Sequence, residues 1–256
     1  MLPMGIDGHI RNPKRRRVST QVASWTTFSP MALGADGWWD ASDESTLTKS
    51  GSSVSQWNDK SGLGRNFVQA TAANQPVTGT NTLNGLTTIT FDGVNDGMTA
   101  NGGVSGKVVT SMFVVMKMIT QGTTINTGFS QGGSGTFFAS RILYRNTGNA
   151  LTLDRWGGGY AASNWDVGGP FHCFGVVINS ATSLTLVRDR ETFTGTAGTL
   201  IAMLSNNVDI GYFSSPSPQY WSNIAVAEVV LFHRTVTPQE RLLLTDYFSA
   251  KWGLGI

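Results

Sequence analysis

From Gly37 to His233 the sequence is a succession of short runs rich in β-branched and aromatic residues, separated by glycine-containing turn signals. Signals such as Asn84-Gly85 and Gly157-Gly158-Gly159 provide residues that accept the positive φ angles of tight turns. Short runs without helical segments between them argue against βαβ units and predict a sandwich or barrel of antiparallel strands. The candidate strands are 38–41, 54–57, 87–91, 108–118, 137–144, 151–156, 171–179, 184–188, 208–212 and 224–233.

The composition supports an all-β domain of ordinary size. Of the 256 residues, 31 are glycine and only 13% are charged. A low proportion of charged residues disfavours helices on the protein surface, whereas frequent glycine suits many tight turns. Because β-sandwiches of this length commonly form single units, we expect one two-sheet domain over residues 36–256.

One strong helix is predicted, at the C-terminal end of the chain. Thr237 is a suitable N-cap, Pro238 suits the first helical position, Glu240 can close a capping box, and Gly253 is a C-terminal stop. Apolar residues recur on one face at i,i+4 spacing, so we expect the helix to pack on the sandwich. No run of apolar residues is long enough to cross a membrane, and we expect no membrane insertion.

The first 35 residues differ from the rest in charge and pattern. They hold five basic residues against one acidic residue, a net charge of +4, and the remaining 13 basic and 15 acidic residues give −2. A segment without an apolar face cannot bury its own surface, so we expect an extended arm over residues 1–35 that binds a partner. Nucleic acid is the less favoured partner, because a short basic run is common and the body is mildly acidic. The candidate partner-binding residues are Arg11, Lys14, Arg15, Arg16 and Arg17.

Several segments, in their order and spacing, carry a family resemblance. They are WWDASD (38–43), VSQWNDKSG (54–62), NG (84–85) followed by FDG (91–93), IAVAEVVLF (224–232), and the capped helix ending KWG (251–253). Together they resemble the concanavalin A-like, laminin-G-like jelly-roll domains common in bacteriophage structural proteins and bacterial surface proteins. The resemblance implies a two-sheet antiparallel jelly roll and, for many relatives, glycan binding or a structural role in a virion.

Enzymatic chemistry finds little support in the sequence. Jelly-roll glucanases use two carboxylates about 5–5.5 Å apart, and the Glu-x-Asp-x-x-Glu pattern of that family is absent. The nearest pair, Asp189 and Glu191, has the surroundings of a solvated hairpin turn. His9, His172 and His233 lack the spacing of metal ligands or of a nucleophile's base, so we expect them to be structural. We predict that the chain is not an enzyme, and a glycoside hydrolase is the least favoured alternative.

Calcium is the one cation for which the sequence offers ligands. Asp92, Asn95 and Asp96 place three oxygen-bearing side chains within five residues of a turn. The same residues stabilise turns without any metal through side chain-to-backbone hydrogen bonds, and this interpretation is favoured. The single cysteine, Cys173, allows neither an intrachain disulfide nor a thiolate metal site. We therefore expect no cofactor.

Glycan binding needs exposed aromatic faces flanked by Asp, Asn or Gln, usually on loops. Residues 154–166 have that composition, and residues 217–223 are a second, weaker case. The competing interpretation is a buried tryptophan, which we expect for Trp38, Trp57 and Trp252 and leave open for Trp165 and Trp221. The candidate glycan-binding residues are Asp154, Trp156, Tyr160, Asn164, Trp165, Asp166, Tyr220 and Trp221.

The leading functional hypothesis combines the resemblance with the arm. It is a non-enzymatic decoration, fibre or adhesin protein of a tailed bacteriophage, assembled in the host cytoplasm and located in the virion. The arm would bind other capsid or tail proteins, several copies would associate as a homo-oligomer, and the lectin-like domain would project outward. The alternative is a carbohydrate-binding module that recognises host-surface glycans.

Overall fold

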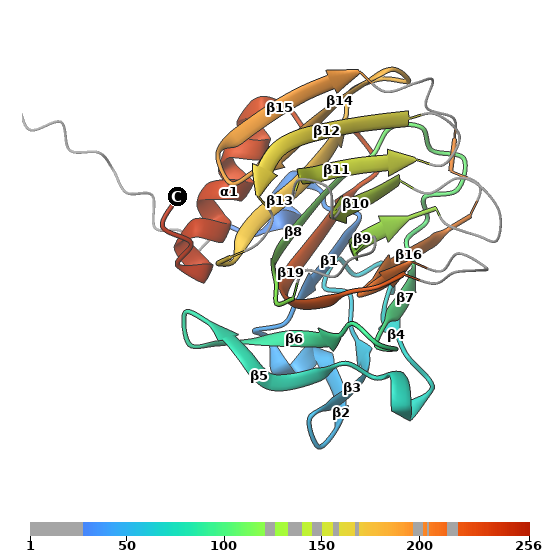
Figure 1. The fold of residues 1–256 in the computed structure, drawn as a ribbon, viewed down its shortest axis with the longest axis vertical. Coiled ribbons are helices and arrows are strands. Elements are labelled where there is room, and N and C mark those ends of the chain that lie inside the picture. Colours follow the sequence, from blue (N-terminus) through green and yellow to red (C-terminus); the bar gives the residue numbers. More distant parts are fainter. Residues whose placement is uncertain are drawn as a thin grey trace, which may run out of the picture.

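The computed structural model describes residues 28–120, 126–132, 140–144, 150–155, 159–166, 169–196, 202–203, 205–213 and 220–256. In these residues antiparallel strands dominate, and one α-helix follows the last strand (Figure 1). The predicted all-β fold with a C-terminal helix is therefore confirmed. The five basic residues of the predicted arm lie outside the described residues. No described helix has the length and apolar character that a transmembrane span requires.

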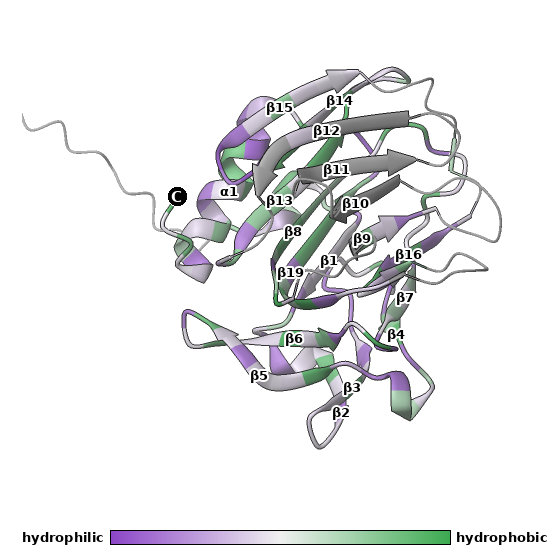
Figure 2. Cartoon of the chain, in the orientation of Figure 1, coloured by the Kyte–Doolittle hydropathy of each residue, from purple (hydrophilic) through white to green (hydrophobic). Residues whose placement is uncertain are grey.

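Six strands form one layer, which we call the helix-side sheet because the helix packs on its outer face. All its neighbouring strands run antiparallel. Its central strands are covered on both faces, so they are apolar almost throughout, as Figure 2 shows for β8 and β19. In spatial order the strands are β1 (Gly37–Asp40), β19 (Asn223–Phe232), β8 (Ser111–Met118), β13 (His172–Ile178), β14 (Ser183–Arg188) and β15 (Glu191–Thr196).

Six further strands form the second layer, which we call the opposite sheet. Neighbouring strands are again antiparallel, and the two layers face each other across an apolar core. In spatial order the strands are β7 (Met98–Asn101), β16 (Asn207–Ile210), β9 (Asn126–Gln131), β10 (Ser140–Tyr144), β11 (Ala150–Arg155) and β12 (Gly159–Asp166).

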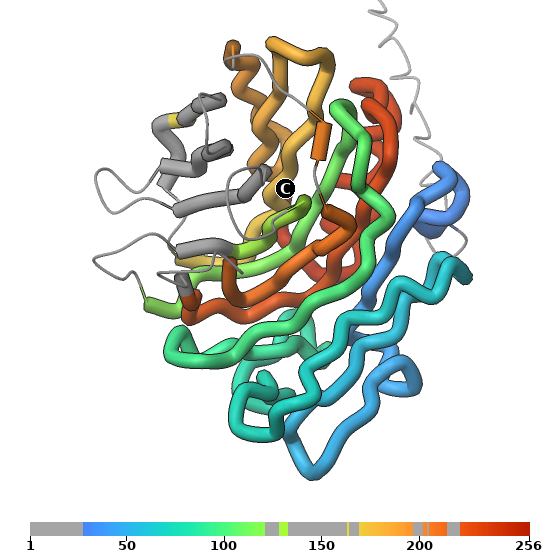
Figure 3. The backbone as a smooth tube through the Cα atoms, turned by 90° about the vertical axis from the view of Figure 1, so that its right-hand side faces the viewer, coloured from blue at the N-terminus to red at the C-terminus, as the bar shows by residue number. Residues whose placement is uncertain are grey.

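The remaining strands connect the two layers at one end of the molecule, where Figures 1 and 3 both place them. β6 pairs with β19 of the helix-side sheet, and β4 pairs with β7 of the opposite sheet. These strands are β2 (Leu47–Ser50), β3 (Ser53–Trp57), β4 (Phe67–Val68), β5 (Val77–Leu83) and β6 (Leu86–Asp92). A separate ribbon of β17 (Tyr212–Phe213) and β18 (Tyr220–Trp221) lies against β9 of the opposite sheet. In the described part of the chain, short 3-10 helices span Pro30–Leu33, Glu44–Thr46 and Ala72–Asn74.

The predicted turn between β5 and β6 is present. Asn84 and Gly85 have φ angles of 52° and 74°, as a two-residue hairpin turn of primed type requires. Several strands that the sequence did not predict lie at edges or carry little apolar alternation. β5 and β15, for example, are rich in threonine and contain no buried residue.

Helix α1 (Pro238–Trp252) has the predicted caps. The Glu240 backbone N–H donates to Thr237 Oγ1 (3.2 Å), and the Thr237 N–H donates to Glu240 Oε2 (2.7 Å). Gly253 ends the helix with a φ of 65°. The helix covers a second apolar core on the outer face of the helix-side sheet, which includes Phe113, Phe232, Leu244, Phe248 and Trp252.

A buried carboxylate joins α1 to the sheet. Glu228 on β19 is 0% exposed and accepts four side-chain hydrogen bonds. Trp38 Nε1 (2.6 Å) and Tyr247 Oη (2.9 Å) donate to Oε1. Lys251 Nζ (2.8 Å) and Trp252 Nε1 (2.7 Å) donate to Oε2. Trp38 and Trp252, two of the three tryptophans that the sequence predicts to be structural, thus share one acceptor. Trp57 and Trp252 are fully buried as expected, whereas Trp38 is half-buried.

Residues 28–35, which the predicted boundary assigns to the arm, pack against the domain. The ring of Phe28 lies 5.6 Å from that of Tyr247 on α1. Arg234 Nη2 donates to the Leu33 carbonyl (2.7 Å), and Ala35 is buried. The chain therefore joins the domain beside α1.

Candidate functional site

A row of polar residues crosses the opposite sheet on the face turned away from the core. On β16, Val208 and Ile210 enter the core between the sheets, and successive side chains of a strand alternate between its faces. Asp209 therefore faces outward. The register pairs Asp209 with Thr99 on β7 and with Ser130 on β9, so the three residues lie side by side on this face.

Hydrogen bonds tie this row together. Thr99 Oγ1 donates to Asp209 Oδ1 (2.8 Å), and Ser130 Oγ donates to Asp209 Oδ2 (3.3 Å). Tyr212 Oη lies 2.6 Å from Thr99 Oγ1. Because the Thr99 hydroxyl already donates its hydrogen to Asp209, Tyr212 Oη must be the donor in its contact with Thr99. Burial, together with the charge of Asp209, raises the pKa of Tyr212 and keeps its phenol neutral.

An aromatic pair covers the polar row. Tyr212 on β17 and Trp221 on β18 are register partners, and their rings stack with centroids 4.9 Å apart and planes 14° apart. Both residues are half-buried, whereas Asp209 is 0% exposed. We call Thr99, Ser130, Asp209, Tyr212 and Trp221 together the aromatic face.

Two glycines allow Tyr212 to reach this position. Gly211 has a φ of 79°, which redirects the chain between the core residue Ile210 and Tyr212. A Cβ at Gly211 would lie 2.1 Å from the buried ring of Phe91, and a Cβ at Gly97 would lie 2.3 Å from the Tyr212 ring. Both close approaches therefore depend on the absence of a side chain.

The predicted glycan-binding residues divide into two groups. Trp221 belongs to the aromatic face, and Tyr220 lies next to it on β18, paired with Phe213. Trp156 lies outside the described residues. The others are on β11 and β12, at Asp154, Tyr160, Asn164, Trp165 and Asp166.

Residues 154–166 have the composition expected of a binding loop, but most of the segment is strand. β12 begins at Gly159 and pairs with β11, with Asp154 opposite Tyr160. The small and polar residues of β12 lack the apolar alternation by which strands are recognised. The register is irregular between Ala150 and Thr152, a place where one strand carries extra residues.

Backbone register connects this hairpin to the aromatic face. Ser130 on β9 pairs with Arg141 on β10, Arg141 pairs with Asp154 on β11, and Asp154 pairs with Tyr160 on β12. The register row that begins at Thr99 and Asp209 therefore continues across the sheet. Arg141 was not among the residues predicted from the sequence.

The candidate calcium residues form a turn. Asp92 Oδ1 accepts backbone N–H groups of Val94 (2.8 Å), Asn95 (3.1 Å) and Asp96 (3.2 Å). Asp96 Oδ2 accepts the Asp92 N–H (3.1 Å), and burial followed by the charge of Asp92 raises the Asp96 pKa to about 6. This is the turn chemistry that the sequence favoured. In the part of the chain that the structure describes, no group of three or more His, Cys, Asp or Glu side chains is placed to hold a metal ion.

Asp189 lies in the hairpin turn between β14 and β15, and Glu191 begins β15, but the expectation that the pair is solvated is wrong for Asp189. Asp189 has a φ of 58°, is mostly buried, and accepts the Cys173 N–H (2.9 Å). His172 Nδ1 lies 2.5 Å from its other oxygen. Glu191 is exposed and pairs with Arg188 (2.9 Å), so the two carboxylates have different surroundings and partners.

The two histidines that the structure describes, His172 and His233, are consistent with the structural role expected of them. His172 is held by Asp189, and His233 Nε2 lies 2.8 Å from the Gly102 carbonyl oxygen. His9 lies outside the described residues.

No protein-family model and no curated protein matches the sequence. Solved structures do resemble the fold. Trypanosoma rangeli sialidase in complex with sialic acid has a TM-score of 0.59 at 13% identity, over 84% of this chain and 33% of that chain. The Botulinum neurotoxin serotype G binding domain has a TM-score of 0.61 at 12% identity, over 86% of this chain and 54% of that chain.

A third similar structure is the Botulinum neurotoxin serotype D ligand binding domain in complex with N-acetylneuraminic acid. It has a TM-score of 0.57 at 12% identity, over 85% of this chain and 52% of that chain. This chain therefore spans about a third of the sialidase and about half of the toxin domains. Similarity at this level of identity shows the fold alone, a β-sandwich. The bacteriophage part of the family resemblance stays a prediction.

Proposed function

We propose that this domain is a carbohydrate-binding module whose binding surface is the aromatic face. The observation that carries the proposal is the stacked Tyr212 and Trp221 pair beside a buried, hydrogen-bonded carboxylate. An aromatic ring accepts the C–H face of a sugar, and fixed polar groups next to it select the hydroxyls. Similar structures in complex with sialic acid and with N-acetylneuraminic acid support the proposal.

The residues of the face have different roles in this proposal. Asp209 is fully buried, so it orients other groups and does not itself contact a sugar. It holds the Thr99 hydroxyl, which in turn orients the Tyr212 phenol. Trp221 supplies ring surface for stacking. A face whose polar groups are fixed before the ligand arrives loses less entropy on binding.

Replacing Trp221 by alanine tests the proposal. We expect at least about tenfold weaker binding of the glycans that the wild type retains on a glycan array, because the stacking surface is lost. Affinities would then be measured by isothermal titration calorimetry. Phe193→Ala is a matched control, since Phe193 is an exposed aromatic residue on β15 of the other sheet, and it should bind as the wild type does.

Two results would overturn the proposal. One is a glycan array on which the wild-type protein binds no glycan. The other is a Trp221→Ala protein that keeps the wild-type circular dichroism spectrum and the wild-type glycan affinity.

We further propose that the module is a non-enzymatic display domain of a virion, anchored by residues 1–27 to other particle proteins. The specific observation in favour is the arrangement of the domain. Phe28 packs against α1, outside the helix-side sheet, and the aromatic face lies outside the opposite sheet. An anchor on one side and a binding face on the other is the geometry that outward display requires.

Removing residues 1–27 tests the anchoring. Because residues 28–35 pack on α1, this truncation keeps the described contacts of the domain. We expect a folded protein that is no longer incorporated into particles, measured by co-sedimentation of tagged protein with assembled virions. Replacing Lys14 and Arg15–Arg17 by glutamine should give the same loss. Wild-type incorporation of the truncated chain would contradict the anchoring.

A further inference from the structure

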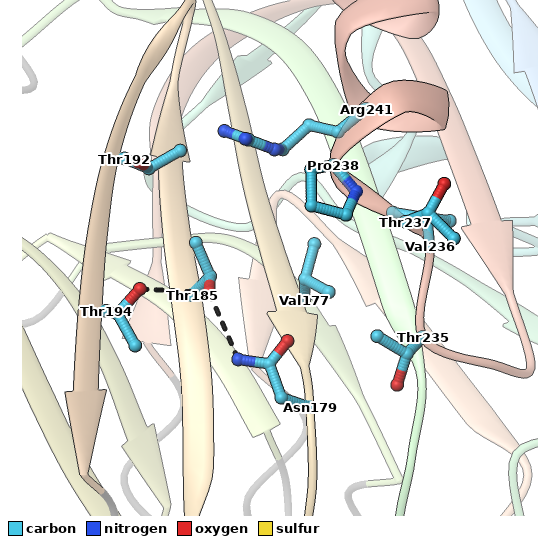
Figure 4. Close-up of a pocket in the computed structure, with 10 residues that line it drawn as sticks. All are labelled: Val177, Asn179, Thr185, Thr192, Thr194, Thr235, Val236, Thr237, Pro238 and Arg241. Atoms are coloured by element: carbon cyan, nitrogen blue, oxygen red, sulfur yellow. Dashed lines mark hydrogen bonds between the residues drawn. The ribbon is translucent and has the colours of Figure 1, made fainter.

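A groove lies on the far side of the sandwich from the aromatic face, between strands β13 to β15 and the start of α1 (Figure 4). Its volume is about 360 Å³, which is within the usual size range of small-molecule sites. The floor is apolar, because Val177 and Val236 line it and each is only 3% exposed. The groove therefore offers an aliphatic surface at its base.

Hydroxyl and amide groups line the side formed by the strands. Thr185 on β14 is the register partner of Val177 on one side and of Thr194 on the other. Asn179 Nδ2 donates to Thr185 Oγ1 (3.1 Å), and Thr185 Oγ1 lies 3.3 Å from Thr194 Oγ1. Thr192 is exposed on the same edge strand. This wall can donate and accept hydrogen bonds over two neighbouring strands.

A single guanidinium group reaches across the groove from the helix. Figure 4 shows Arg241 extending from α1 toward Thr192. The Arg241 side chain has no hydrogen bond or ion pair with any described residue, and burial lowers its pKa. The neighbouring carboxylate does not neutralise it, because Glu240 is bound by Arg234 at 2.7 and 2.9 Å. Among the described residues, this partly buried cation is thus left without a counter-ion beside a wall of hydroxyls.

We propose that this groove is a second binding site, for a sugar that carries a carboxylate. The guanidinium can bind a carboxylate in bidentate fashion, the threonine wall matches sugar hydroxyls, and Val177 can contact a C–H face. The helix N-terminus is not needed for this recognition, because its cap is already formed by Thr237 and Glu240. The site is also separate from the aromatic face, so either proposal can fail without the other.

Galacturonate and galactose form a matched pair of probes, because they differ by the carboxylate. In a ¹H–¹⁵N NMR titration of the full chain, we expect galacturonate to shift the amide signals of Thr192, Thr194 and Arg241 with a dissociation constant on the order of millimolar. Arg241→Gln should weaken the binding by at least about tenfold, the size expected for a charged hydrogen bond. Arg190→Gln removes the same charge from an exposed arginine outside the groove and should have no effect. Trp221→Ala should leave these shifts unchanged.

Three results would overturn the proposal. In the first, galactose binds as tightly as galacturonate, so that the carboxylate is not recognised. In the second, inorganic phosphate shifts the same signals with equal affinity, so that the groove binds anions without selecting a sugar. In the third, Arg241→Gln keeps the affinity of the wild type for galacturonate.

Discussion

Glu228→Ala is expected to lower the free energy of unfolding by about 3–5 kcal/mol, the usual cost of removing one partner from a buried ion pair. Lys251 would lose its fully buried partner, and the indole N–H groups of Trp38 and Trp252 would lose their acceptor. Burial raises the pKa of Glu228, and these donors together with Tyr247 compensate for the cost of burying the carboxylate. The helix would therefore lose its polar link to β19, although Lys251 would keep its ion pair with Asp40 (2.7 Å).

Urea denaturation followed by tryptophan fluorescence would measure this loss. Glu44→Ala is the control, because Glu44 is exposed and pairs only at the surface with Lys49 and Thr87. Its denaturation midpoint should stay close to that of the wild type, as surface ion pairs contribute little. A Glu228→Ala midpoint equal to that of the control would refute a stabilising role for the network.

Gly211→Ala should lower the free energy of unfolding by about 2–4 kcal/mol, the sum of a left-handed backbone penalty and overpacking. The new methyl group would lie 2.1 Å from the ring of Phe91, which is fully buried and cannot move into solvent. Relief of this clash would displace Tyr212 from Thr99. We therefore expect the variant to lose glycan affinity as well as stability.

The matched control is Gly51→Ala. Gly51 also has a positive φ, 60°, but a Cβ there would meet no atom within 4 Å. This variant should lose only the backbone contribution, about 1 kcal/mol. Thermal unfolding of the two variants side by side isolates the clash with Phe91. Equal losses would show that the packing at Gly211 has no special role.

Local signals in the sequence were sufficient for the fold class and for the helix. The turn at Asn84-Gly85 and the capping box of Thr237 and Glu240 depend only on residues close together in the chain, and both are present. Strands without such local signals, such as β15, were missed. Their side chains are exposed at a sheet edge and show no alternation of apolar and polar residues. Tertiary pairing defines such strands, and a single sequence does not reveal it.

The aromatic face was only partly predictable. Trp221 was found from its composition, but its partners Thr99, Ser130 and Asp209 come from three strands that the register brings together. One signal was available, because Asp209 is a charged residue between Val208 and Ile210 in an otherwise apolar run. A carboxylate in such a run must be hydrogen-bonded if it is buried, and its partners indicate a polar cluster.

Phe28 lies beside α1, across the sandwich from Trp221. This arrangement affects how strongly many copies together adhere to a cell. If residues 1–27 fasten each copy to a repeating particle surface and the aromatic face binds sugars, every copy presents that face in the same outward sense. Contacts that are weak one at a time then act together, since each bound copy raises the effective concentration of its neighbours at the target. Selection on such a protein would act on spacing and copy number as much as on the affinity of one domain.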